Sequence, residues 1–181
     1  MLLRPARLLH RANNKRGLST AGSEIFGGLA RDQFVRLAEE GTPFVSEVLG
    51  LKCQEVARNK LVMALAMKKE FVGRRDNRVL HGGVVAAAID HVGGFAAWTA
   101  VAPNQMVSTV DLRIDYLTPA PYETLIVIGE IVSGKTRLMR ADIRVETQSG
   151  SVVAIGRGLY NVYSGPDGFD MRKAWLGTTK E

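Results

Sequence analysis

The sequence predicts an α+β fold in which an antiparallel sheet of about six strands wraps around one long central helix. The central element is an apolar segment from about residue 83 to residue 100. A helix that is apolar on nearly every side has to be surrounded by other structure. Segments on both sides of it have the composition or the alternation of strands. The chain has 181 residues, 46% of them hydrophobic, and can therefore supply the core of one such domain.

The first 23 residues are predicted to form a leader. They combine leucine, serine and threonine with five basic and no acidic residues, the basic ones being Arg4, Arg7, Arg11, Lys15 and Arg16. This composition is typical of a mitochondrial transit peptide and predicts a matrix location, whereas a disordered basic tail is the alternative. The leader holds five of the 24 Lys and Arg residues, so the remaining chain has 19 basic and 18 acidic groups. A nearly neutral body argues against nucleic-acid binding.

The rest of the composition excludes two further classes of protein. The single cysteine, Cys53, excludes an internal disulfide and a cysteine-rich zinc site. We expect Cys53 to be a small apolar residue in a strand. The longest apolar stretch is interrupted by Asp90 and His91, so no membrane span is predicted.

Residues 24–44 are predicted to contain a short amphipathic helix. Phe34 and Ala38 recur at helical spacing behind Asp32, and Gly41 ends the pattern. We expect this helix to act as a lid or a clasp on the domain that follows.

Two strands are expected before the long helix, over residues 51–58 and 60–71, with Asn59 in the turn between them. The alanine and methionine content of the second segment also fits a helix. Residues 73–78 are expected to form a polar loop.

A third strand is predicted after the long helix. The stretch "STVDLRIDYLTPAP" alternates apolar residues with Asp111, Arg113 and Asp115 and ends at Pro119. This period of two is the pattern of a half-buried strand. The apolar residues expected to face the core are Val110, Leu112, Ile114 and Tyr116.

Three more strands are expected over residues 124–132, 136–147 and 152–163. The first two are joined by the Ser133-Gly134-Lys135 turn, and a Ser-Gly-Ser turn follows the second. The charged residues of the middle strand that should face outward are Arg140, Asp142, Arg144 and Glu146.

The stretches "VLHGGVVAAAIDHVGG" and "STVDLRIDYLTPA" resemble the phenylacetate-pathway type of acyl-CoA thioesterases in the hotdog superfamily. The resemblance covers about residues 45–163 and is carried by the His-Gly-Gly turn with an Asp eight residues after its first Gly. It implies a hotdog thioesterase domain over residues 45–165, followed by a tail over 166–181. The implied reaction converts acyl-CoA to a free acid and coenzyme A in a homodimer or a dimer of dimers. Coenzyme A is part of the substrate, and no metal or redox cofactor is implied.

The chemistry of thioester hydrolysis explains why an acid lies within an apolar helix. Burying a carboxylate is costly, so Asp90 needs partners or a task. The reaction needs a carboxylate that activates water or attacks the carbonyl, and Asp90 is the only acid on this helix. It also needs a donor for the oxyanion, which the N–H of Gly82 at the helix start can supply. The resemblance assigns these same roles and adds Thr109, which orients the water. Nucleophilic and general-base roles for Asp90 stay open.

Five residues are expected to contact the substrate. Gly83 has no side chain and lets the acyl group approach the helix start. The family usually has an Asn before the turn that orients the thioester, and this chain offers Asn77 in a loop of unusual spacing. We expect His81 to fix the turn through hydrogen bonds rather than to transfer protons. Ser108 is expected to line the pocket, and Arg137 either binds a phosphate of coenzyme A or is simply solvated.

His91 should point about 100° away from Asp90 on a helix, so we expect it to pack or hydrogen-bond at a subunit interface. Gly82 and Asp90 are eight residues apart, which is about 12 Å along a helix. One thioester carbonyl requires its oxyanion donor and its carboxylate within roughly 6–7 Å of each other. We therefore expect a two-fold dimer in which Gly82 of one subunit faces Asp90 of the other.

A function without catalysis is the alternative to a thioesterase. Because a fold does not by itself imply activity, a non-catalytic acyl-CoA-binding or scaffold protein is the alternative. Hotdog dehydratases and hydratases use a paired His and acid in motifs that this sequence lacks.

Overall fold

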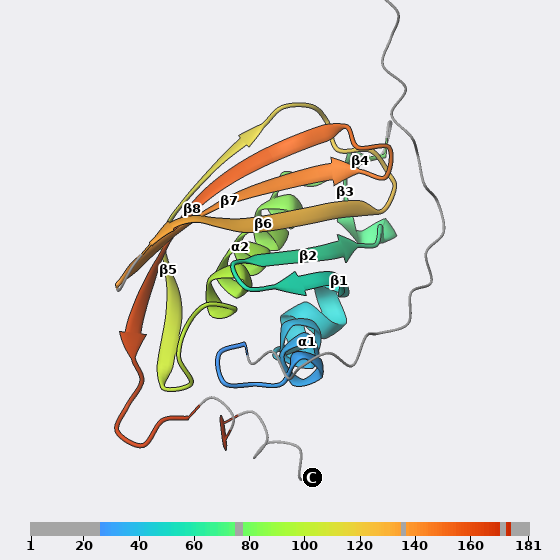
Figure 1. Ribbon diagram of the computed structural model, residues 1–181. Helices are drawn as coiled ribbons and strands as arrows, with labels where there is room; N and C mark the ends of the chain where they lie inside the picture. The colour runs from blue at the N-terminus through green and yellow to red at the C-terminus, as the bar shows by residue number, and fades with distance from the viewer. Residues whose placement is uncertain (1–25, 75–77, 135–136, 171–172, 175–181) are drawn as a thin grey trace, which may run out of the picture.

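A six-stranded antiparallel sheet curves around one central helix in the computed structural model, which describes residues 26–74, 78–134, 137–170 and 173–174 (Figure 1). The helix, α2 (Gly82–Trp98), packs mainly against β2, β5, β6, β7 and β8. This arrangement confirms the predicted α+β hotdog fold. In order across the sheet the strands are β1 (Leu51–Ala57), β2 (Lys60–Leu65), β6 (Leu125–Gly134), β7 (Leu138–Thr147), β8 (Val152–Ser164) and β5 (Gln105–Tyr116).

Helix α2 begins one residue before the predicted start and ends two residues before the predicted end. The side chains that it buries are all apolar and mostly small, and Ile89 and Val92 are fully covered. Burial of one such side chain stabilises the fold by about 1.5–3 kcal/mol. Small residues also let the sheet approach closely, since a Cβ atom on Gly129 of β6 would lie 3.0 Å from Val92.

The predicted amphipathic helix is present as α1 (Arg31–Glu40), whose Phe34 and Ala38 are fully buried. Figure 1 shows α1 beside β1, at the end of the sheet opposite β5. A short π-helix (Phe44–Leu49) follows, which the sequence did not predict. It ends at Gly50, whose φ of 68° favours glycine.

The second strand is shorter than predicted. β2 ends at Leu65, which pairs with Leu125, the first residue of β6. The chain therefore leaves the sheet at the point where the neighbouring strand β6 begins. A 3₁₀ turn (Lys69–Phe71) then buries Phe71. A two-stranded hairpin of β3 (Val72–Arg74) and β4 (Val79–Leu80) follows. The prediction of a loop over 73–78 is therefore wrong at its start, whereas the turn at Asn59, with φ of 66°, is confirmed.

Strand β5 departs from strict alternation at a β-bulge. Thr109 pairs with Tyr160 and Asp111 pairs with Leu159, which leaves Val110 as an extra residue. The bulge turns Thr109 toward α2 and leaves Val110 57% exposed. The prediction that Val110 faces the core is therefore wrong.

The C-terminal part of β5 keeps the predicted alternation. Leu112 and Ile114 pack against the core, whereas Tyr116 is exposed. The strand ends at Tyr116 rather than at Pro119, because the N–H groups of Leu117 and Thr118 both turn to the carbonyl of Val153.

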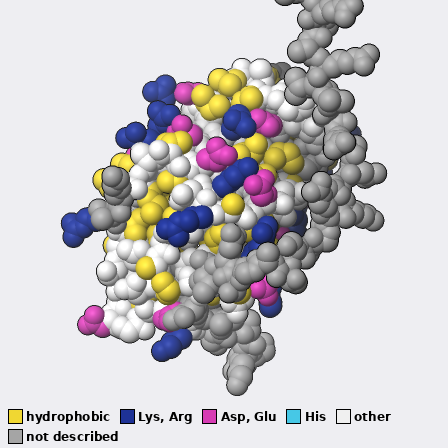
Figure 2. All heavy atoms as spheres, viewed as in Figure 1, with side chains coloured by type: hydrophobic (Ala, Val, Ile, Leu, Met, Phe, Trp, Pro, Cys, Tyr) yellow, Lys and Arg dark blue, Asp and Glu magenta, His cyan; other side chains and the backbone are white. Residues whose placement is uncertain are grey.

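The remaining strands begin and end within two residues of their predicted bounds. The charged residues of β7 lie on the outer face as predicted, where Asp142 pairs with Arg157 and Arg144 with Glu146. Figure 2 shows Lys and Arg side chains interspersed with Asp and Glu on the face seen in Figure 1. No helix in the described part of the chain is long and apolar enough to cross a membrane. The predicted leader, residues 1–23, and Asn77 lie outside the described residues.

Candidate active site

The start of α2 presents one backbone donor that the helix itself does not use. The first N–H groups of any helix lack intrahelical acceptors. His81 satisfies two of them: its Nδ1 accepts from the N–H of Gly83 and its carbonyl accepts from the N–H of Val84, both at 3.0 Å. The N–H of Gly82 has no acceptor among the described residues. His81 thus makes hydrogen bonds of the kind expected for fixing the turn. The free donor lies at the positive end of the helix dipole.

Tyr116 holds this turn against the end of β5. Its hydroxyl donates a 3.0 Å hydrogen bond to the carbonyl of Gly82. The ring of Tyr116 packs against the helix start, since a Cβ atom at Gly82 would lie in van der Waals contact with it at 3.4 Å. The sequence analysis assigned Tyr116 only an apolar role, because alternation carries no information about the hydroxyl.

A pocket of about 340 Å³ lies beside this turn. Its lining is mainly apolar, as in most pockets that bind small molecules. The residues around it are Val79, Leu80, Gly82, Val85, Tyr116, Leu117, Thr118, Pro119, Ala120, Val153 and Ala154.

Two turns farther along α2, Asp90 faces β5. Its Oδ1 accepts a 2.8 Å hydrogen bond from the Thr109 hydroxyl, and its side chain is half-buried. The bulge at Val110 is what turns Thr109 inward for this contact. The other carboxylate oxygen, Oδ2, has no partner among the described residues and is therefore open to a water molecule or a substrate. The structure thus brings together the predicted pair of Asp90 and Thr109.

The free N–H and the carboxylate do not meet within one chain. Gly82 and Asp90 lie on the same straight helix, eight residues and hence about 12 Å apart. β5 contacts both groups, with Tyr116 at Gly82 and Thr109 at Asp90. One chain therefore contains two half-sites at two positions along one edge strand.

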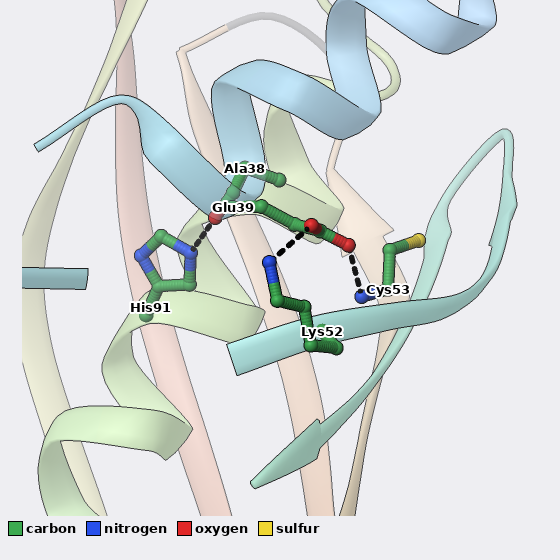
Figure 3. A network of polar contacts seen from close by, with 5 residues as sticks. All are labelled: Ala38, Glu39, Lys52, Cys53 and His91. Carbon is green, nitrogen blue, oxygen red and sulfur yellow. Dashed lines mark hydrogen bonds and ion pairs between the residues drawn. The ribbon is translucent and has the colours of Figure 1, made fainter. Parts of the chain in front are cut away.

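His91 contacts its own chain instead of the expected second subunit. Its Nε2–H donates to the carbonyl of Ala38 at 2.8 Å (Figure 3). Its ring lies 4.4 Å from that of Phe95. The reason is that α1 folds back over α2. Burial lowers the pKa of His91. The hydrogen bond to Ala38 and the negative charge of Asp90 raise it, but by less. His91 is therefore a neutral contact between two helices.

Glu39 joins α1 to β1 in the same region (Figure 3). Its Oε2 lies 2.8 Å from Nζ of Lys52, and its Oε1 accepts the backbone N–H of Cys53 at 2.8 Å. Burial raises the pKa of the Cys53 thiol, which argues against a nucleophilic role. Cys53 is half-buried in β1 and packs on the core, as predicted.

The other predicted contact residues are more scattered. Ser108 is exposed and, because side chains alternate along a strand, points to the opposite face of β5 from Thr109. The expectation that Ser108 lines a substrate pocket together with Thr109 is therefore not supported. Arg137 is exposed at the start of β7, where its carbonyl accepts the N–H of Val162. Within the part of the chain that the structure covers, no three His, Cys, Asp or Glu side chains are grouped to hold a metal ion.

Known proteins match this chain in the region of the half-sites. A family model described as "Thioesterase superfamily" matches residues 77–154, which include Gly82, Asp90 and Thr109. The medium/long-chain acyl-CoA thioesterase YigI of Escherichia coli K12 is 23% identical over 133 residues, which are 66% of this chain and 85% of YigI.

Two further matches extend the comparison. A protein of Saccharolobus solfataricus named "Putative esterase SSO2140" is 26% identical over 118 residues, covering 65% of this chain and 82% of that protein. The crystal structure of a thioesterase family protein from Silicibacter pomeroyi superimposes with a TM-score of 0.67 at 21% identity, over 74% of this chain and 98% of that one. At this identity the structural match shows the shared fold.

Proposed function

This chain belongs to the thioesterase superfamily, and from that premise we propose that it hydrolyses acyl-CoA to a free acid and coenzyme A. The observation that carries the proposal is the pairing of Asp90 with Thr109, which leaves one carboxylate oxygen open beside an edge strand. The free N–H of Gly82 supports it, because thioester hydrolysis requires an oxyanion donor. The Escherichia coli relative is named as an acyl-CoA thioesterase, which favours this substrate class.

The proposed reaction uses these groups in sequence. The thioester carbonyl oxygen accepts a hydrogen bond from Gly82 N–H, which stabilises the negative charge of the tetrahedral intermediate. Asp90 takes a proton from water through its open oxygen, and the hydroxide adds to the carbonyl carbon. The carbon–sulfur bond then breaks, and the thiolate of coenzyme A leaves and takes the proton from Asp90. Direct attack by Asp90 is the alternative, with an anhydride that water then cleaves.

A complete site requires two subunits. β5 is the edge strand of the sheet, and its exposed residues include Val110 and Tyr116. An unpaired edge of this length readily pairs with another strand. If two copies of β5 pair antiparallel about a two-fold axis between Leu112 and Arg113, Thr109 lies opposite Tyr116 of the partner subunit. Thr109 holds Asp90 and Tyr116 holds Gly82, so this register brings the two kinds of half-site together twice.

The direct test is the release of free thiol from a panel of acyl-CoA esters of different chain length. We expect turnover by the wild type and a kcat lower by roughly 10²–10⁴ in Asp90→Asn, with little change in KM. Asp167→Asn, at an exposed position in the C-terminal segment, is the matched control and should be fully active. Binding without turnover on every ester would favour the acyl-CoA-binding alternative.

Two further parts of the proposal rest on sequence. The basic composition of residues 1–23 supports a mitochondrial matrix location for the mature enzyme. Arg137 is a candidate for a phosphate of coenzyme A, because it is exposed next to the strand that pairs with β5. A guanidinium binds phosphate through two parallel hydrogen bonds, so Arg137→Ala should raise KM for acyl-CoA without lowering kcat.

A further inference from the structure

The hydroxyl of Tyr160 is buried without a partner. Tyr160 lies on β8, its side chain has 0% exposure, and its hydroxyl has no hydrogen-bond acceptor or donor among the described residues. A buried polar group without a partner lowers stability, and phenylalanine would fill the same space without that cost. The hydroxyl therefore calls for an explanation other than packing.

Glycines make room for this tyrosine. A Cβ atom on Gly93 of α2 would lie 2.1 Å from the hydroxyl oxygen, and one on Gly158 of β8 would lie 2.5 Å from the ring. A Cβ atom on Gly94 would lie 3.6 Å from the same ring, which is an ordinary contact, so it is Gly93 on the helix that the tyrosine requires. Glycine is unfavourable inside a helix, so Gly93 by itself weakens α2. The fold accepts this loss where the tyrosine contacts the helix.

The position of Tyr160 is adjacent to Asp90. Gly93 and Gly94 follow Asp90 by three and four residues, so they share its face of α2. Thr109, which binds Asp90, is the direct cross-strand partner of Tyr160 in the β5–β8 ladder. Such partners have their Cβ atoms about 4.5–5.5 Å apart on one face of the sheet.

Electrostatics agrees with this placement. Burial and, next, the negative charge of Asp90 raise the pKa of Tyr160 well above its ordinary value. The phenol therefore keeps its proton at neutral pH, and it can act as a donor toward a carboxylate. The other described group whose titration responds to Asp90 is His91, which points away toward α1.

We propose that Tyr160 is a positioning residue for Asp90: its buried hydroxyl, which has no partner among the described residues, is the donor that meets the carboxylate from the sheet side when Asp90 acts, while Thr109 holds it from the edge strand. This inference rests on the proposed catalytic role of Asp90. Removal of the hydroxyl takes this donor away, so Asp90 is less stabilised as an anion and less well oriented. The ring of Tyr160 serves packing, and the hydroxyl serves the site.

The test compares Tyr160→Phe with the wild type and with two controls, Asp90→Asn and Tyr163→Phe. Tyr163 lies on the same strand, is 40% exposed, and loses the same atom when replaced by phenylalanine. For Tyr160→Phe we expect a roughly tenfold lower kcat with similar KM, and an acidic limb of kcat/KM displaced to higher pH. Its melting temperature should equal or exceed that of the wild type, because an unpaired buried hydroxyl is removed. Tyr163→Phe should change neither activity nor stability.

Each contrary outcome is distinct. If Asp90→Asn is inactive while Tyr160→Phe keeps the wild-type kcat and pH profile, the positioning role is wrong and the proposed function stands. A Tyr160→Phe variant that loses activity together with stability, at an unchanged pH profile, shows that the hydroxyl is structural, which also overturns the inference. Full activity in Asp90→Asn would overturn the proposed function and this inference together.

Discussion

Thr109 donates a 2.8 Å hydrogen bond to Asp90 because the strand that carries it contains one extra residue, Val110. Without that bulge the alternation of β5 would place Val110 against the helix and Thr109 toward solvent. The irregularity of the strand therefore provides the carboxylate with its donor. The contact also leaves Oδ2 of Asp90 open, which the proposed reaction requires.

The first prediction concerns this hydrogen bond. Thr109→Val keeps the shape of the side chain and removes the donor, so we expect kcat to fall by roughly tenfold in thiol-release assays. Thr109→Ser keeps a hydroxyl and should recover most of the activity. Equal activity in the Val and Ser variants would show that shape, rather than the hydrogen bond, is what matters at this position.

The second prediction concerns His91 and pH. Burial lowers the pKa of His91 in the folded chain below its ordinary value of 6.5. As the pH falls below that value the unfolded chain binds a proton first, so the stability provided by neutral His91 is present above about pH 6.5 and declines below it. His91→Gln retains a donor for the carbonyl of Ala38 and does not titrate.

Urea unfolding at fixed protein concentration, at pH 7.5, 6 and 5, measures this effect. The wild type should lose more unfolding free energy between pH 7.5 and 5 than His91→Gln does. Parallel losses in both proteins would show that His91 does not titrate differently in the folded and unfolded chains.

The third prediction decides between a clasp and a lid for α1. In Glu39→Ala the partly buried backbone N–H of Cys53 loses its acceptor, so we expect the free energy of unfolding to fall by about 1–3 kcal/mol. Glu39→Gln keeps an acceptor oxygen and loses mainly the ion pair with exposed Lys52, so it should lose under about 1 kcal/mol. A clasp leaves kcat and KM of both variants near the wild type. A changed KM in Glu39→Gln would instead favour a lid over the substrate.

The fourth prediction concerns the leader. A chain that begins at Ser23 should fold and keep full activity, because the domain that contains the half-sites lies beyond it. Residues 1–23 fused to a fluorescent protein should direct it to mitochondria, as imaged in living cells. A reporter that stays in the cytosol would contradict the targeting assignment.

The hydrophobic periodicity of the sequence was enough to predict the fold and half of the candidate site. The apolar run that includes Ile89 and Val92 predicts a central helix, and the isolated acid within it identifies Asp90. These inferences work because a helix and an alternating strand are patterns between near neighbours in sequence. The position of Gly82 at the helix start follows from the same pattern.

The parts that sequence could not predict depend on distant partners. The bulge at Val110 is set by pairing with Leu159 and Tyr160, and strand β2 ends where its partner β6 begins. His91 binds Ala38, 53 residues away in the chain. No local pattern contains such information, and the hydroxyl of a tyrosine has no influence on the alternation that identified β5.

The shared site is tested most directly by mixing two inactive variants, Asp90→Asn and Gly82→Pro. Proline removes the N–H and is tolerated at the first position of a helix, and His81, with φ of −68° and ψ of 129°, has the extended backbone that precedes proline. Each parent dimer has two damaged sites, whereas a mixed dimer has one intact site and one doubly damaged site.

After verified subunit exchange at equal concentrations, half of the dimers are mixed. We therefore predict that thiol release from acyl-CoA returns to about one quarter of the wild-type rate per total protein. Exchange without any recovery, in two variants that are both folded, would show that each subunit builds its own site and would contradict the pairing of Gly82 with Asp90 of the partner subunit.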